Sequence, residues 1–130
     1  MFKIISEQLV WWPVTFPGVT EDGEIVENRF EMRFRILQED AHLEFLQKGA
    51  GEIALSEDGS AAAPAPSEKA ASIISQIAVD WRQVAAENGE AIKFSDDHLR
   101  QLLNVPNTFR AILSAYGACR GGRAEARAGN

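Results

Sequence analysis

The sequence predicts an α+β domain in which an N-terminal antiparallel β-hairpin packs with about four α-helices. Two observations indicate this fold class. Apolar residues alternate with polar ones between residues 10 and 36, as in strands that bury one face. After residue 39 the apolar residues recur at spacings of three and four, which is the period of a helix. A flexible linker in mid-chain and a C-terminal tail complete the prediction.

Length and composition favour one domain over residues 1–130, since 45% of the residues are hydrophobic and 25% charged. The formal net charge of −6 makes the chain a poor candidate for wrapping a phosphate backbone. A single cysteine excludes an intrachain disulfide and suits a reducing compartment. No signal peptide or stretch of ~18 apolar residues is present, so we expect a cytoplasmic protein with no membrane partner.

Residues 1–48 are expected to form the hairpin and a short helix. Pro13 has no N–H, which places the first strand at a sheet edge. Pro17-Gly18 is expected to end that strand, and residues 21–24 (Glu-Asp-Gly-Glu) supply a turn. The return strand is expected over 25–36, with a bend or bulge near residues 27–28. A helix follows over 39–48, with Gly49 as its stop signal.

Residues 49–66 read as a linker of small residues, and residues 67–118 as the helical part. The first helix there is expected over 67–87, because Ile73, Ile77, Trp81 and Val84 form one stripe and Asn88-Gly89 resembles a C-cap. Ser95 is expected to cap the next helix, and Pro106 to separate it from the last one, which Asn104 or Asn107 caps. Residues 119–130 are expected to form a flexible tail.

The same patterns predict which side chains form the core. These are the apolar residues that face inwards in every predicted element, namely Trp12, Phe30, Phe34, Ile77, Trp81, Leu99, Leu102, Phe109 and Tyr116.

The chain contains no recognisable catalytic motif, so we expect neither an enzyme nor a cofactor or metal site. His42 and His98 each lie near two acidic residues, but one histidine supplies too few ligands, and both acids suit a helix start. Cys119 neighbours Arg120, which could lower the pKa of its thiol, yet no histidine is close in the sequence. A structural role is the simpler explanation for all three.

Trp11 is the best residue-level indication of a binding surface. It lies next to Trp12 in a predicted strand, so the two side chains point to opposite faces of the sheet. If Trp12 is buried, Trp11 is either covered by the linker or a helix, or presented to a partner. Arg33 and Arg35 on the return strand also point away from the apolar row and complete the predicted partner-binding set.

The arrangement of motifs resembles the tail assembly chaperone family of long-tailed bacteriophages and their prophages. The C-terminal half carries Val79-Asp80-Trp81, Phe94-Ser95-Asp96-Asp97, Leu99 with Leu102-Leu103, Pro106, and Ala111-Ile112 with Ala115-Tyr116. The segment Phe30-Glu31-Met32-Arg33-Phe34-Arg35, which leads into an acidic short helix, is also similar. The residues after Trp81 depart from the pattern, because Arg82-Gln83-Val84 stands where a small residue is expected.

The resemblance implies a non-enzymatic protein in the cytoplasm of a bacterial host. It would bind the helical tape measure protein, keep it soluble and give way to the tail tube protein during assembly. Whether it forms a homo-oligomer is left open. The alternative is a small prophage regulatory or nucleic-acid-associated protein that uses Arg120, Arg123 and Arg127, although Glu125 interrupts these arginines and no aromatic residues interleave them.

Overall fold

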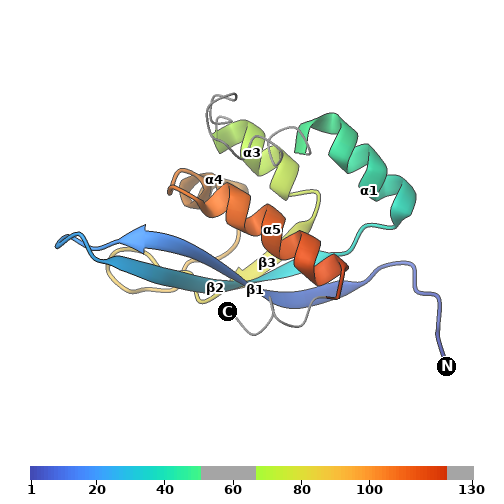
Figure 1. Ribbon diagram of the computed structural model, residues 1–130, viewed down its shortest axis with the longest axis horizontal. Coiled ribbons are helices and arrows are strands. Elements are labelled where there is room, and N and C mark those ends of the chain that lie inside the picture. The colour runs from blue at the N-terminus through green and yellow to red at the C-terminus, as the bar shows by residue number, and fades with distance from the viewer. Residues whose placement is uncertain (51–66, 123–130) are drawn as a thin grey trace.

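The computed structural model describes residues 1–50 and 67–122, and these form one sheet covered by helices. The strands β1 (Leu9–Val19), β2 (Ile25–Arg35) and β3 (Ala78–Arg82) make an antiparallel sheet in the order β1-β2-β3. The helices α1 (Glu39–Phe45), α3 (Ser67–Ile74), α4 (Asp96–Leu103) and α5 (Thr108–Arg120) lie on one side of that sheet (Figure 1). The predicted α+β class is therefore confirmed.

The register of the sheet explains which residues face the helices. Trp12, Met32 and Trp81 are directly opposite one another on the three strands, and all three are buried. The next row, Trp11, Arg33 and Asp80, points to the other face, since successive side chains alternate. β1 is an edge strand, as Pro13 predicts.

The hairpin is longer and more regular than expected. Pro17 and Gly18 do not end β1, because its pairing with β2 continues to the opposed residues Val19 and Ile25. No bulge interrupts the β1–β2 register at residues 27–28 either. The turn itself is where the sequence predicts it, and Gly23 adopts the left-handed φ of 85° that glycine tolerates.

The prediction of one helix over 67–87 is wrong. α3 ends at Ile74, where the N–H groups of Gln76 and Ile77 bond back three residues, and β3 then pairs with the open edge of β2. The register places Arg33 opposite Asp80 and Phe34 opposite Ala78, so Val79 is an extra residue in β3. This bulge turns both Ala78 and Trp81 towards the core at a spacing of three, which imitates a helix.

Other boundaries in the second half also differ. Asn88-Gly89 is not a helix C-cap but part of a tight turn, in which the N–H of Ala86 donates to the carbonyl of Glu90 at 2.8 Å. Residues 67–118 are thus not wholly helical. Gly49 does not stop the first helix, because a π-helical turn, η1 (Leu46–Ala50), continues from α1. Of the linker predicted over 49–66, residues 51–66 lie outside the described residues. The tail predicted over 119–130 begins too early, because Cys119 and Arg120 belong to α5, and residues 123–130 lie outside the described residues.

The junction of α4 and α5 follows the predicted chemistry in part. The Ser95 hydroxyl accepts a hydrogen bond from the N–H of His98 at 3.1 Å, which is the expected cap. Asn107 precedes α5 in a left-handed conformation (φ 75°) without a side-chain cap. The buried Thr108 hydroxyl instead lies 2.9 Å from the carbonyl oxygens of both Leu102 and Val105. These contacts connect the start of α5 to the end of α4 and to the loop between them.

The core lies between the helices and the inner face of the sheet. Of the nine residues predicted for it, seven are buried, and Leu102 and Phe109 are partly buried against the same cluster. Aromatic contacts connect distant parts of the chain: the Tyr116 ring meets Phe34 at 5.7 Å, and Trp81 meets Phe94 at 5.2 Å between ring centroids. The indole N–H of Trp81 also donates to the carbonyl of Ile92 at 2.8 Å.

Candidate protein-binding surfaces

The outer face of the sheet carries the three residues that the sequence predicts for partner binding. Trp11 on β1 is directly opposite Arg33 on β2, and Arg35 lies two positions further along the same strand. Trp11 is half-buried because the guanidinium carbon of Arg82 lies 4.3 Å from the centroid of its ring. Arg82 comes from β3, so a neighbouring strand of the same sheet contributes to the cover of Trp11.

Ion pairs occupy much of this outer face. Glu31 accepts from the Nε of Arg82 at 2.6 Å and lies 3.5 Å from Arg29, while the Nε of Arg35 lies 3.2 Å from Glu7. The Nε of Arg33 is buried and has no partner among the described residues. Trp11 and Arg35 are thus held by intramolecular contacts, and Arg33 keeps an unused donor.

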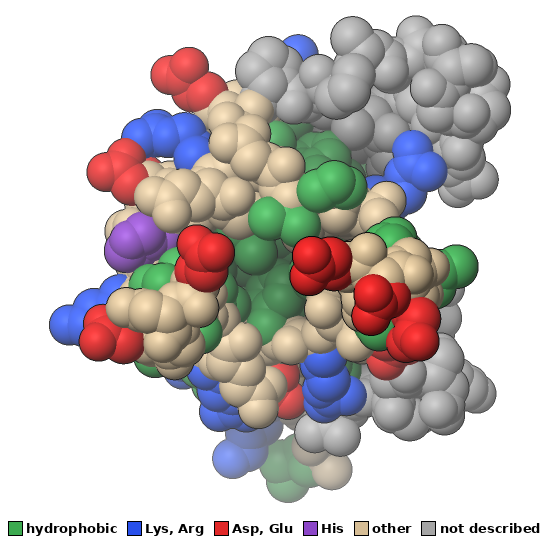
Figure 2. Space-filling model, turned by 90° about the vertical axis from the view of Figure 1, so that its left-hand side faces the viewer, with side chains coloured by type: hydrophobic (Ala, Val, Ile, Leu, Met, Phe, Trp, Pro, Cys, Tyr) green, Lys and Arg blue, Asp and Glu red, His purple; other side chains and the backbone are tan. Residues whose placement is uncertain are grey.

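A second surface, which sequence reasoning missed, lies at the turn end of the hairpin. A groove of about 500 Å³ runs there between the hairpin and the α4–α5 connection. We call it the hairpin-end groove; its lining residues are Phe16, Pro17, Gly18, Val19, Ile25, Asn28, Val105, Pro106 and Asn107. Viewed from this end, the molecule shows hydrophobic side chains at the bottom of a hollow with acidic side chains on either side (Figure 2).

Two local interactions fix the walls of the hairpin-end groove. The side-chain amide of Asn107 donates to the carbonyl of Pro17 at 3.3 Å, which ties the α4–α5 connection to β1. Gly18 leaves room for the Asn28 side chain, since a Cβ at that position would lie 2.3 Å from the Asn28 amide nitrogen. The sequence contains a signal for the hairpin side of this site only: the apolar residues Val19 and Ile25 flank an acidic turn, at positions where polar residues are usual.

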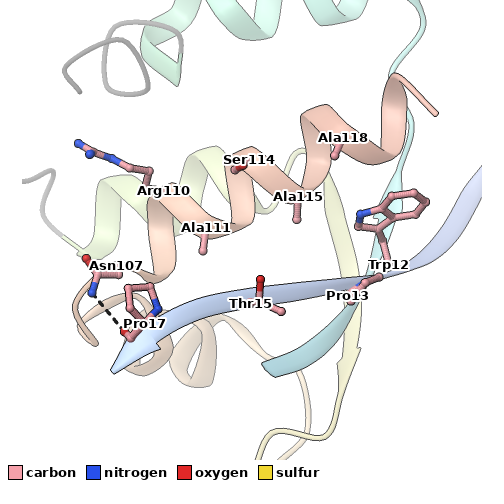
Figure 3. A pocket seen from close by; sticks show the side chains of 10 residues that line it. All are labelled: Trp12, Pro13, Thr15, Pro17, Asn107, Arg110, Ala111, Ser114, Ala115 and Ala118. Carbon is pink, nitrogen blue, oxygen red and sulfur yellow. Dashed lines mark hydrogen bonds between the residues drawn. The ribbon is translucent and has the colours of Figure 1, made fainter. Parts of the chain in front are cut away.

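A smaller groove of about 410 Å³ lies between β1 and α5 (Figure 3). Ala111, Ala115 and Ala118 point from α5 towards the strand, and their small side chains leave the space open. The indole Nε1 of Trp12 is buried at this groove and has no hydrogen-bond partner among the described residues. Pro13 and Pro17 line the strand side, and neither has an N–H to offer a pairing strand.

The two histidines have structural surroundings. His42 stacks on Phe45 at 6.4 Å between centroids and lies 6.0 Å from the Tyr116 ring. Burial and the nearby Arg120 charge lower the pKa of His42, so the neutral ring is favoured. The Nδ1 of His98 lies 2.7 Å from the carbonyl oxygen of Lys93. Across residues 1–50 and 67–122, no group of three or more histidine, cysteine or acidic side chains is placed to hold a metal.

Cys119 is partly buried, and the Arg120 side chain makes contacts within the protein. Burial raises the pKa of the Cys119 thiol to about 11, which suppresses the reactive thiolate. The Nε of Arg120 donates to the carbonyl of Leu37 at 3.1 Å, and its guanidinium pairs with Glu39. Arg120 is therefore engaged within the protein, whereas Arg123 and Arg127 of the predicted arginine tail lie outside the described residues.

Comparisons with family models, curated proteins and solved structures find no match to this chain. In the described part of the chain, no helix is both long and apolar enough to cross a membrane.

Proposed function

We propose that this protein is a phage tail assembly chaperone, which acts by transient binding to the tape measure protein and has no enzymatic activity. The observation that carries the proposal is the hairpin-end groove. Val19 and Ile25 are 71% and 81% exposed there, and Val26 and Val105 close by are also exposed. Among the described residues, the other exposed large apolar side chains lie in the N-terminal segment before β1 and around α1 and η1. Exposed apolar side chains gathered at one site are typical of surfaces that bind other proteins.

The resemblance of the sequence motifs supplies the kind of partner. Tail assembly chaperones resemble this chain in the hairpin and in the motifs around Trp81, Ser95 and Tyr116. In the structure these motif residues have structural roles as core and cap residues, which fits motifs that preserve a fold. Partner contacts are then left to the surface, and each of the three candidate surfaces includes residues of the hairpin.

Co-expression with the tape measure protein encoded by the same phage or prophage tests the proposal. We expect the tagged chain to recover the tape measure protein, or a fragment of it, from the soluble fraction. Expression of the tape measure protein alone is the control, and it should give less soluble material. Failure to recover any tape measure fragment would contradict the proposed function. A tube gene upstream and a very long helical gene downstream would support it independently.

A further inference from the structure

The hairpin-end groove has the character of a site for apolar side chains. Its lining includes Phe16, which is 9% exposed at the floor, and Val105, which is 43% exposed on the opposite wall. Val26, on the hairpin beside the groove, is 37% exposed and extends the apolar surface around the turn. A volume of about 500 Å³ is in the range of protein sites that enclose a ligand.

The charges around the groove have one sign on the hairpin side. Glu21, Asp22, Glu24 and Glu27 are all exposed, and the stretch from residue 19 to 28 contains no lysine or arginine. On the other wall, residues 103–109 carry no charged side chain, and Arg110, the next residue, lines the neighbouring groove between β1 and α5. The nearest base on β2, Arg29, lies 3.5 Å from Glu31. A partner that is basic on either side of its apolar residues would therefore be attracted to this site.

The backbone of the groove argues against an extended partner. Pro17 has no N–H, and its carbonyl already accepts a hydrogen bond from the Asn107 side chain. Pro13 removes a second donor from the same strand. An incoming strand would thus find few groups on β1 to pair with, whereas a helix satisfies its own backbone and offers apolar side chains at positions i, i+3 or i+4, and i+7.

We propose that the hairpin-end groove binds an amphipathic helix of a partner protein whose apolar face is flanked by lysine and arginine. This inference rests on the proposed function, because it names the surface and the chemistry by which the client would be recognised. Apolar side chains of the helix occupy the space between Ile25 and Val105. Its basic residues lie against the acidic turn of the hairpin.

The test uses the full chain and a labelled 18-residue helical peptide composed of leucine and lysine, read by fluorescence anisotropy. We expect saturable binding that weakens as salt rises, since exposed charges are screened. A peptide with glutamate in place of lysine should bind at least about tenfold more weakly. Equal binding of the two peptides would overturn the proposal that the partner helix carries basic residues.

Variants then locate the site. Ile25→Asp should weaken binding of the leucine–lysine peptide roughly tenfold, because a charge replaces an apolar contact at the groove. Leu43→Asp is the matched control, since Leu43 is 52% exposed on α1, and it should bind as the unchanged chain does. Both are surface positions, and thermal melts verify that each variant folds. Equal losses in the two variants would overturn the proposal.

A second pair of variants isolates the acidic turn. Glu24→Gln with Glu27→Gln removes two charges beside the groove and should flatten the salt dependence of binding. Asp40→Asn with Glu68→Gln removes the same net charge from α1 and α3 and should leave that dependence closer to the unchanged chain. Identical effects of the two pairs would show that only net charge matters, which would overturn the assignment to the groove.

Two further outcomes separate this inference from the proposed function. Recovery of the tape measure protein by Ile25→Asp at the level of the unchanged chain would overturn the groove and leave the chaperone function in place. Failure to recover tape measure protein with any version of the chain would contradict the function instead. A shift in oligomeric state with Ile25→Asp, and not with Leu43→Asp, would assign the groove to a second copy of the chain and overturn the proposal.

Discussion

The hydroxyl of Tyr116 accepts a hydrogen bond at 3.2 Å from the backbone N–H of Leu37, a residue 79 positions earlier in the chain. This contact connects α5 to the segment that leaves β2, at a place where the Tyr116 ring also packs on Phe34 and Phe45. The tyrosine is therefore held by its polar end as well as by its ring.

Tyr116→Phe should lower the free energy of unfolding by roughly 1 kcal/mol, because the Leu37 N–H loses its acceptor while the ring contacts stay. Urea denaturation of the variant and the unchanged chain measures this difference. An unchanged midpoint would show that water replaces the hydroxyl without loss.

Trp81→Ala should be far more damaging. Trp81 is 5% exposed, packs edge-on against Phe94 and donates to the carbonyl of Ile92. Large-to-small substitutions of this kind cost roughly 3–5 kcal/mol, which is a large part of the stability of a small domain. Trp81→Phe keeps an aromatic ring but loses the indole N–H. Its free energy of unfolding, measured by denaturation, should lie between those of Trp81→Ala and the unchanged chain. Similar stability of Trp81→Ala and the unchanged chain would contradict the observed packing.

Trp11→Ala should separate binding from folding. The Trp11 side chain is half-buried under Arg82, and a cation–π contact at such a site contributes only about 0.5–1 kcal/mol. We therefore expect a folded variant with a slightly lower denaturation midpoint and weaker recovery of the tape measure protein in the pull-down. Full recovery by this variant would remove the outer face of the sheet from the binding surface.

His42 should make stability depend on pH. Burial lowers the pKa of His42 in the folded chain. As the pH falls below about 6.5, the ordinary pKa of histidine, His42 is therefore protonated more readily in the unfolded chain than in the folded one. The contribution of neutral His42 is therefore fully present above that value and is lost on acidification. Denaturation midpoints at pH 7.5 and 5.5 measure the loss.

The same loss should be smaller in His42→Gln and should persist in His98→Gln, which is the control for the second histidine. Glu39, whose pKa is lowered by its hydrogen bond to Arg120, loses its contribution only at more acidic pH, below its usual carboxyl range. A pH dependence that is unchanged in His42→Gln would contradict the role of His42.

Cys119 should be nearly inert in the native protein. With a pKa of about 11, only about a thousandth of the thiol is ionised at pH 8. Reaction with an aromatic disulfide reagent should be about two orders of magnitude slower in the native chain than in urea, where the pKa returns to roughly 8.5. Native and unfolded rates within a factor of about ten would contradict this burial.

The sequence patterns identified the hairpin, the edge position of β1 and the α4–α5 break because each depends on local chemistry. Pro13, Ser95 and Pro106 act through their own backbone or side chain, so neighbouring residues are enough to interpret them. The error over residues 67–87 has a different origin. Ala78 and Trp81 face the core together only because Val79 bulges against β2, and that pairing joins residues more than 40 positions apart.

The candidate site was partly predictable for the same reason. Strand alternation alone places the Trp11 side chain on the opposite face of the sheet from Trp12. Its contact with Arg82 could not be predicted without knowing that β3 belongs to the same sheet. The hairpin-end groove needs Val105 and Pro106 to stand beside Val19 and Ile25, which no local pattern indicates. Contacts between distant segments decided both cases.

The late position of β3 has a consequence during synthesis. The last residues of β2 and β3, Arg35 and Arg82, are 47 positions apart, a stretch that takes roughly 2–9 s to translate at about 5–20 residues per second. Until β3 is synthesised, one edge of β2 lacks its partner strand, and an unpaired strand edge can pair with another chain. The chain thus passes through an interval on the ribosome in which this edge of β2 is open to incorrect pairing.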